Sequence, residues 1–129
     1  MIAVKNRVNG IQHLGIPTRD MESTLSFYQT IGFERIYETL NNGKRVCFLQ
    51  LASLVIEAYE ADDTAGKPGA IDHVALDVDD IEQVWQEAQA RNFQLLHTEI
   101  QFLPFFENGV RFFTIVGPNQ EKVEFNQKM

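Results

Sequence analysis

Cysteine is nearly absent from this sequence: Cys47 is the only one in 129 residues. A single cysteine excludes a disulfide framework within the chain and fits a reducing compartment, so we expect a cytoplasmic protein. Cys47 lies in the apolar run VCFLQL. This setting predicts a role in core packing rather than in thiol chemistry.

Long apolar runs and an excess of basic residues are also missing. Charged residues interrupt every apolar stretch, so we expect no membrane-spanning segment, and the opening MIAVKNRVNG does not resemble a signal peptide. Lysine and arginine number 11 against 18 aspartate and glutamate, which gives a formal net charge of −7. This balance argues against a nucleic-acid partner and leaves a small-molecule substrate as the expectation. The length predicts one domain, 1–129.

An internal repeat is the main feature that the sequence does contain. The phrases IQHLGI at 11–16 and IDHVAL at 71–76 each have a histidine in third place, and His13 and His73 are sixty positions apart. Three further pairs share this offset without a gap: Asp20 and Asp80, Leu25 and Trp85, and Phe33 and Phe93. The chain is therefore expected to contain two copies of one structural unit.

Each copy, about 8–60 and about 70–127, is expected to form one strand, one helix and three further strands. Asp20 and Asp80 suit the N-caps of the two helices, while Gly32 and Asn92 suit the left-handed residues that end them. The segment ADDTAGKPGA at 61–70 is the predicted linker. The predicted strands are 11–16, 34–40, 44–51 and 53–60 in the first copy, and 71–76, 94–100, 110–116 and 121–126 in the second.

This pattern predicts an α+β fold in which two βαβββ modules form a cupped mixed sheet. A helix would cover one face of each module and leave the other face concave. Strand alternation places His13 and His73 on that open face, and the alternation in SLVIEAYE and EKVEFNQ places Glu57 and Glu124 there too.

These four residues are candidate metal ligands. A strand histidine or glutamate is more often an ordinary polar residue on the wet face of an open sheet. Their joint occurrence at equivalent places in both copies favours a shared role. Two imidazoles and two carboxylates, completed by water, suit a divalent ion such as nickel, cobalt, zinc, manganese or iron(II), and open water positions would make it catalytic. His97 has no counterpart and is expected at the surface or an edge.

The stretch QFLPFFENG at 101–109 is unusually apolar for the loop between strands that we expect there. Its aromatic side chains could pack on the core or on a dimer interface. Alternatively, they could form a hydrophobic wall or lid that excludes water from the metal. Arg111 and Lys122 are the candidate cations for an anionic substrate group.

The chain resembles the vicinal oxygen chelate superfamily of glyoxalase, bleomycin-resistance and extradiol-dioxygenase proteins. The resemblance runs from Gly10 to Gln127 and is carried by IQHLGIPTRDMESTLSFYQTIGF, VIEAYE, IDHVALDVDDIEQVWQEA and FFTIVGPNQEKVEF. Within the superfamily the ligand set is most similar to glyoxalase I (lactoylglutathione lyase), because Glu57 stands where epimerases typically have glutamine.

The resemblance implies an enzyme that converts the hemithioacetal of a thiol and methylglyoxal into a 2-hydroxyacyl thioester through an enediolate. It implies a metal held by His13, Glu57, His73 and Glu124, with Glu124 as the leading base and Glu57 as a second proton-handling carboxylate. It also implies a homodimer in which each site takes one half from each chain. An acyl-CoA epimerase and a non-catalytic drug- or metabolite-binding protein of the same superfamily remain alternatives.

Overall fold

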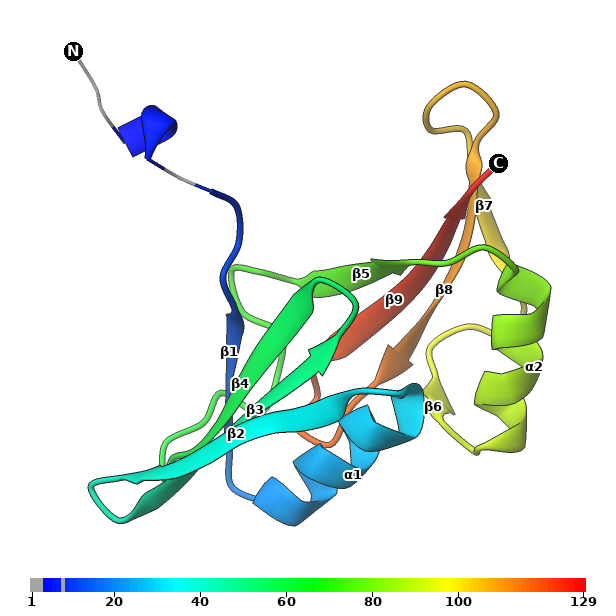
Figure 1. The fold of residues 1–129 in the computed structure, drawn as a ribbon. Helices are drawn as coiled ribbons and strands as arrows, with labels where there is room; N and C mark the ends of the chain where they lie inside the picture. The colour runs from blue at the N-terminus through cyan, green and yellow to red at the C-terminus, as the bar shows by residue number, and fades with distance from the viewer. Residues whose placement is uncertain (1–3, 8) are drawn as a thin grey trace. The chain divides into compact units, whose positions relative to one another are not determined.

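The computed structural model describes residues 4–7 and 9–129, and its chain divides into two compact units, Met1–Thr64 and Ala65–Met129. The first unit contains the 3-10 helix η1 (Val4–Asn6), strand β1 (Leu14–Thr18), helix α1 (Met21–Ile31) and strands β2 (Glu34–Asn41), β3 (Lys44–Leu51) and β4 (Leu54–Glu60). The second contains β5 (His73–Asp77), α2 (Ile81–Ala90), β6 (Gln94–Leu95), β7 (Gln101–Leu103), β8 (Val110–Val116) and β9 (Lys122–Lys128) (Figure 1).

The two units are built alike. The first sheet has the order β1-β4-β3-β2 and the second β5-β9-β8-β6, with β7 also paired to β8. In each sheet the first strand runs parallel to the last, and the other pairs are antiparallel. The predicted α+β class is confirmed, as is the order of strand, helix and further strands in each copy.

Both helices begin at the predicted caps. The Asp20 carboxylate accepts a hydrogen bond from the Ser23 backbone N–H at 3.0 Å, and the Asp80 carboxylate accepts one from the Gln83 N–H at 3.2 Å. These bonds satisfy donors that the first turn of a helix leaves without a partner.

The helix ends repeat as well. Gly32 follows α1 with a φ of +126°, and Asn92 follows α2 with a φ of +59°. The next residue in each case, Phe33 or Phe93, donates its N–H to the carbonyl five positions back, at 3.0 and 3.1 Å. Both ends therefore use the left-handed residue that the sequence predicts.

Each helix covers one face of its own sheet, and the core of each unit lies between that helix and that sheet (Figure 1). Trp85 is half-buried and packs edge-on against Phe113 at 4.9 Å between ring centroids, while Cys47 is fully buried, so the predicted core role of Cys47 is confirmed. The largest fully buried apolar side chains of the first unit are Leu25, Tyr28, Cys47, Leu49 and Ile56, and those of the second are Ile81, Val110, Phe113, Ile115 and Val123.

The predicted strand 94–100 is wrong. The structure has one short strand in this stretch, β6, and a second, β7, directly after it; the two pair with opposite ends of β8. Leu95 lies opposite Ile115 and Gln101 opposite Phe112, so five residues of one chain segment span only two residues of β8. Leu96 still donates its N–H to the Thr114 carbonyl at 3.0 Å, and the surplus leaves residues 97–100 outside the ladder. The expected loop 101–109 correspondingly begins with strand β7.

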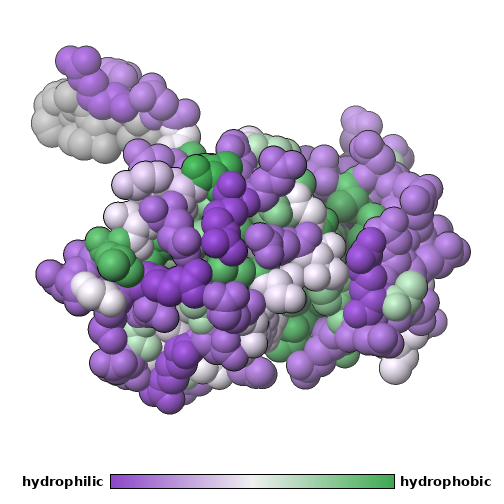
Figure 2. All heavy atoms as spheres, turned by 60° about the horizontal axis from the view of Figure 1, so that its bottom comes forward, coloured by the Kyte–Doolittle hydropathy of each residue, from purple (hydrophilic) through white to green (hydrophobic). Residues whose placement is uncertain are grey.

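The visible face in Figure 2 is mostly hydrophilic with scattered apolar patches, in keeping with the net charge of −7. All eight residues of the edge strand β2 are exposed. No helix within residues 4–7 and 9–129 is long and apolar enough to cross a bilayer.

Candidate metal-binding site

In the first unit, His13 and Glu57 meet on the face of the sheet away from α1. His13 immediately precedes β1, and Glu57 lies on the neighbouring strand β4, opposite Gly15. The distance from His13 Nε2 to Glu57 Oε1 is 3.2 Å. The imidazole edge also contacts Phe48, the β3 partner of Glu57, at 5.7 Å between centroids. An aromatic wall on one side and a carboxylate on the other fix the position of the ring.

In the second unit, His73 and Glu124 form the equivalent pair. His73 opens β5, and Glu124 lies on β9 opposite Ala75, which is sixty positions from Gly15. The distance from His73 Nε2 to Glu124 Oε1 is 3.5 Å. Glu124 is the more enclosed carboxylate, with its side chain 14% exposed against 27% for Glu57.

Glu124 has a further partner. Asn126, two residues along β9, donates from Nδ2 to Glu124 Oε2 at 2.9 Å. The bond holds one carboxylate oxygen and leaves Oε1 facing His73. Tyr59, two residues after Glu57, occupies the corresponding place in the first unit. The second carboxylate is therefore held at both oxygens, whereas Glu57 has its ion pair with His13 at Oε1.

The opposite nitrogen of each ring contacts the residue that precedes the histidine. His13 Nδ1 lies 2.9 Å from Gln12 Oε1, and His73 Nδ1 lies 2.9 Å from Asp72 Oδ2. Lys122 Nζ contacts the same Asp72 carboxylate at 3.2 Å. The hydrogen bond with His73, supported by the Lys122 ammonium, holds the pKa of Asp72 below its usual range.

Each imidazole thus has an oxygen acceptor at both ring nitrogens. A neutral imidazole carries only one N–H and can satisfy only one of them. Asp72 and Glu124 both offer only acceptor oxygens, so a neutral His73 ring can donate to one of them alone, and a cation between Nε2 and Glu124 would satisfy the other contact. A histidine nitrogen and a carboxylate oxygen are both good ligands for a divalent transition ion.

The structure brings the four predicted ligands together as two pairs, one in each unit. Within residues 4–7 and 9–129, no group of three or more histidine, cysteine, aspartate or glutamate side chains converges on one metal position. The joint four-ligand site stays a prediction. His97 lies outside both pairs, on the segment between β6 and β7, with its ring edge-on to Phe112 at 6.0 Å.

Sequence reasoning missed Gln12, Asp72 and Asn126. The first two did carry a signal, because they precede the two histidines and are themselves sixty positions apart. Of the two candidate cations, Lys122 lies beside His73 on the open face. Arg111 is wrong for that role, because it forms an ion pair with Glu82 on α2 at the other face.

The apolar hairpin between β7 and β8 does not pack in the core as one interpretation expected. Its side chains are exposed, between 38% for Leu103 and 72% for Phe106, and Lys128 Nζ lies 4.5 Å from the Phe106 ring centroid. The alternatives of a lid or a dimer contact stay predictions.

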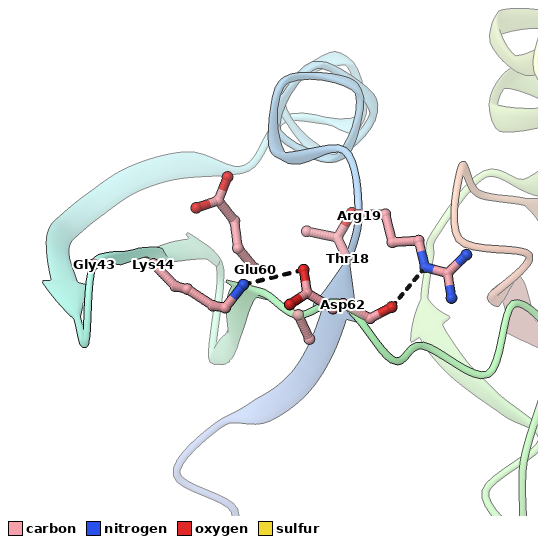
Figure 3. A pocket seen from close by; sticks show the side chains of 7 residues that line it. Thr18, Arg19, Gly43, Lys44, Glu60 and Asp62 are labelled. Atoms are coloured by element: carbon pink, nitrogen blue, oxygen red, sulfur yellow. Dashed lines mark hydrogen bonds and ion pairs between the residues drawn. The ribbon is translucent and has the colours of Figure 1, made fainter.

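A separate polar pocket of about 390 Å³ lies at the far end of β1 (Figure 3). Asp62 organises it: its carboxylate accepts from Lys44 Nζ at 3.1 Å, and its backbone carbonyl accepts from Arg19 Nε at 3.1 Å. Glu60 also lines the pocket and accepts from the Arg45 backbone N–H. These contacts tie the β2–β3 turn to the end of β4 and use none of the predicted ligands.

Comparison with known proteins places the chain in a family. The model of the Glyoxalase/Bleomycin resistance protein/Dioxygenase superfamily matches residues 10–101. The chain is 30% identical to "Uncharacterized protein YwbC" of Bacillus subtilis (strain 168), over 92% of this chain and 97% of that protein.

Two solved structures illustrate the shared fold. A glyoxalase family protein from Enterococcus faecalis matches with a TM-score of 0.78 at 21% identity, over 92% of this chain and 97% of that one. The fosfomycin resistance protein FosX from Listeria monocytogenes, complexed with Mn(II) and sulfate, matches with a TM-score of 0.74 at 16% identity, over 95% of this chain and 94% of that one. By the family-model match and the 30% identical relative, the chain belongs to the Glyoxalase/Bleomycin resistance protein/Dioxygenase superfamily.

Proposed function

We propose that this protein is a metal-dependent, glyoxalase I-like enzyme that converts a thiol–methylglyoxal hemithioacetal into a 2-hydroxyacyl thioester. The observation that carries the proposal is the repeated histidine–glutamate pair, in which each imidazole has an oxygen at both nitrogens. A neutral ring has one N–H for two acceptor oxygens, and a divalent cation between Nε2 and the glutamate would satisfy the second oxygen in each pair. His13, Glu57, His73 and Glu124 would hold nickel, cobalt, zinc or manganese; a FosX structure with Mn(II) shows that one protein of this fold takes such an ion.

The chemistry assigned to the protein is a proton transfer between adjacent carbons. The base takes the proton from the carbon that bears sulfur, and the proton returns to the neighbouring carbon, so atoms balance without an oxidant or reductant. A bound divalent cation supplies positive charge that stabilises the enediolate oxygens. Glu124 is the proposed base and Glu57 the second carboxylate that handles the proton.

The bonding around the two carboxylates supports unequal roles. The amide of Asn126 holds Oε2 of Glu124 while Oε1 faces His73, so this base would be presented in one orientation. Glu57 is more exposed and has no equivalent amide two residues on. Glu57 is therefore better suited to the second proton-handling role than to the role of the base.

Thioester formation from methylglyoxal tests the proposal. The purified protein is loaded in turn with nickel, cobalt, zinc or manganese and supplied with several thiols. We expect turnover with at least one combination. Glu124→Gln should lower turnover by about a hundredfold or more, the usual scale for a general base, and Glu57→Gln by less. Near-wild-type activity in both variants would refute carboxylate proton transfer.

The same assay separates the alternatives. An acyl-CoA epimerase would form no thioester from methylglyoxal but would exchange the α-proton of an acyl-CoA with solvent. A non-catalytic binding protein would do neither.

We further propose a homodimer in which each metal site combines His13 and Glu57 of one chain with His73 and Glu124 of the other. Mixing His13→Ala with Glu124→Ala protein under subunit exchange tests this. In the heterodimer one composite site would carry both defects and the other would be intact, so activity would return. Sites formed within one chain would stay defective in every dimer, and an absence of recovered activity would reject the composite arrangement.

A further inference from the structure

The residue before each predicted histidine ligand contacts the far side of its ring. Gln12 Oε1 and Asp72 Oδ2 each lie 2.9 Å from the Nδ1 atom of the histidine that follows. We propose that Gln12 and Asp72 are the positioning residues of the metal centre: they hold the hydrogen on Nδ1 and leave Nε2 free for the cation. This inference rests on the proposed function for its purpose, but its geometry is independent of the reaction.

The physical reason is the two-fold ambiguity of an imidazole. A histidine on an open sheet face can turn its ring over, and either nitrogen can carry the hydrogen. An acceptor at Nδ1 favours the ring orientation and the tautomer that place a hydrogen there, and it competes with the glutamate that draws the hydrogen to Nε2. In both units the orientation that is selected directs Nε2 at the glutamate, at 3.2 Å in the first and 3.5 Å in the second.

The two positioning residues differ in the strength of the hydrogen bond that each can accept from its histidine. Asp72 is a carboxylate that Lys122 Nζ anchors at 3.2 Å, and Lys122 is the β9 partner of His73. A hydrogen bond to an ionised acceptor is roughly twice as strong as one between neutral groups. Gln12 offers a neutral amide oxygen. The His73 side chain is also the more exposed of the two, at 42% against 33%, and so depends more on its hydrogen bond. We therefore infer that Asp72 contributes more than Gln12.

The test compares Asp72→Ala, Asp72→Asn and Gln12→Ala with the intact chain. Asp77→Ala is the matched control, because Asp77 is an exposed acid at the other end of β5 and carries the same charge. Zinc binding is measured by calorimetry. We expect Asp72→Ala to weaken zinc binding by about 10- to 100-fold, the usual effect of removing such a partner. Asp72→Asn retains an acceptor oxygen and should recover most of the loss, Gln12→Ala should lose less than Asp72→Ala, and Asp77→Ala should match the intact chain.

A second readout needs no metal. Nitrogen-15 spectra of the ring atoms in the metal-free protein report which nitrogen carries the hydrogen. We expect Nδ1 of His73 to be protonated in the intact chain and in Asp77→Ala, and the hydrogen to shift towards Nε2 in Asp72→Ala, where Glu124 is the remaining acceptor. A His73 ring protonated only at Nε2 in the intact chain, or a spectrum unchanged by Asp72→Ala, would overturn the proposal. Absence of zinc binding in the intact chain with the expected ring spectra would instead count against the proposed function alone.

Discussion

Removal of the His73 side chain is expected to abolish stabilisation by metal while leaving the metal-free fold nearly unchanged. The side chain is 42% exposed and lies on the open face of the sheet, so His73→Ala removes little core packing. Surface substitutions of this kind usually change the free energy of unfolding by no more than about 0.5 kcal/mol. Metal binding, by contrast, would lose one of its two imidazole ligands.

The expected shift in melting temperature follows from mass action. Free metal at one hundred times its dissociation constant stabilises a folded protein by about 2.7 kcal/mol. Unfolding entropy near 2.1 cal/mol/K per residue gives about 0.27 kcal/mol/K for a chain of 129 residues, so the melting temperature should rise by about 10 °C. If His73→Ala weakens binding a hundredfold, the same metal concentration contributes only about 0.4 kcal/mol, or less than about 2 °C.

Thermal unfolding followed by circular dichroism, with nickel, cobalt, zinc or manganese present and with chelator instead, measures the difference. His97→Ala is the matched control, because this histidine packs edge-on against Phe112 outside both pairs. We expect His97→Ala to keep the full metal-induced shift, whatever happens to its baseline stability. An equal shift in His73→Ala and in the intact chain would refute the ligand role of His73.

Two further predictions concern titratable groups away from the pairs. Burial raises the pKa of the Cys47 thiol, so this cysteine should react with a disulfide reagent only as fast as the protein unfolds; rapid reaction in the native state would contradict its core position. Hydrogen bonds from the Ser23 hydroxyl and backbone N–H lower the pKa of Asp20 in the folded state. Its stabilising effect should therefore be complete above about pH 4, the unfolded value, and be lost as the pH falls through the lower folded value. The stability difference between the intact chain and Asp20→Ala, measured by urea unfolding, should shrink on acidification, and a difference that is constant between pH 7 and pH 2 would be inconsistent with this cap.

Much of the fold could be predicted because the sequence contains two copies of the same structural unit. The sixty-residue offset identifies the caps Asp20 and Asp80 together, and each supports the other. The interruption of the strand 94–100 could not be predicted, because it depends on how many residues of β8 remain between the two pairings. Alternation along a single segment contains no information about the length of its partner.

The shared face of each histidine and its glutamate could also be predicted, because strand alternation decides the face. The short distance within each pair depends on the parallel neighbours β1–β4 and β5–β9, which alternation does not specify. The contacts of Gln12, Asp72 and Asn126 depend on side-chain rotamers, which a periodicity does not specify. Arg111 shows the same limit, since its pairing with Glu82 follows from where the helix lies over the sheet.

The differences between the two copies indicate which positions are free to change. In the first, the Thr18 and Thr24 hydroxyls are buried and hydrogen-bonded to each other at 2.9 Å; the residues sixty positions on are both valine. Asp20 is a further partner of both hydroxyls: its backbone N–H donates to Thr18 Oγ1 and its carbonyl accepts from Thr24 Oγ1, each at 2.9 Å. At these two packing positions the copies therefore differ together, as a hydrogen-bonded polar pair in one and an apolar pair in the other. The histidine and the glutamate have not diverged in either copy, although they lie on a half-exposed face where substitution costs the fold little. Stability therefore does not explain why both copies keep the pair, whereas the proposed metal-binding role does.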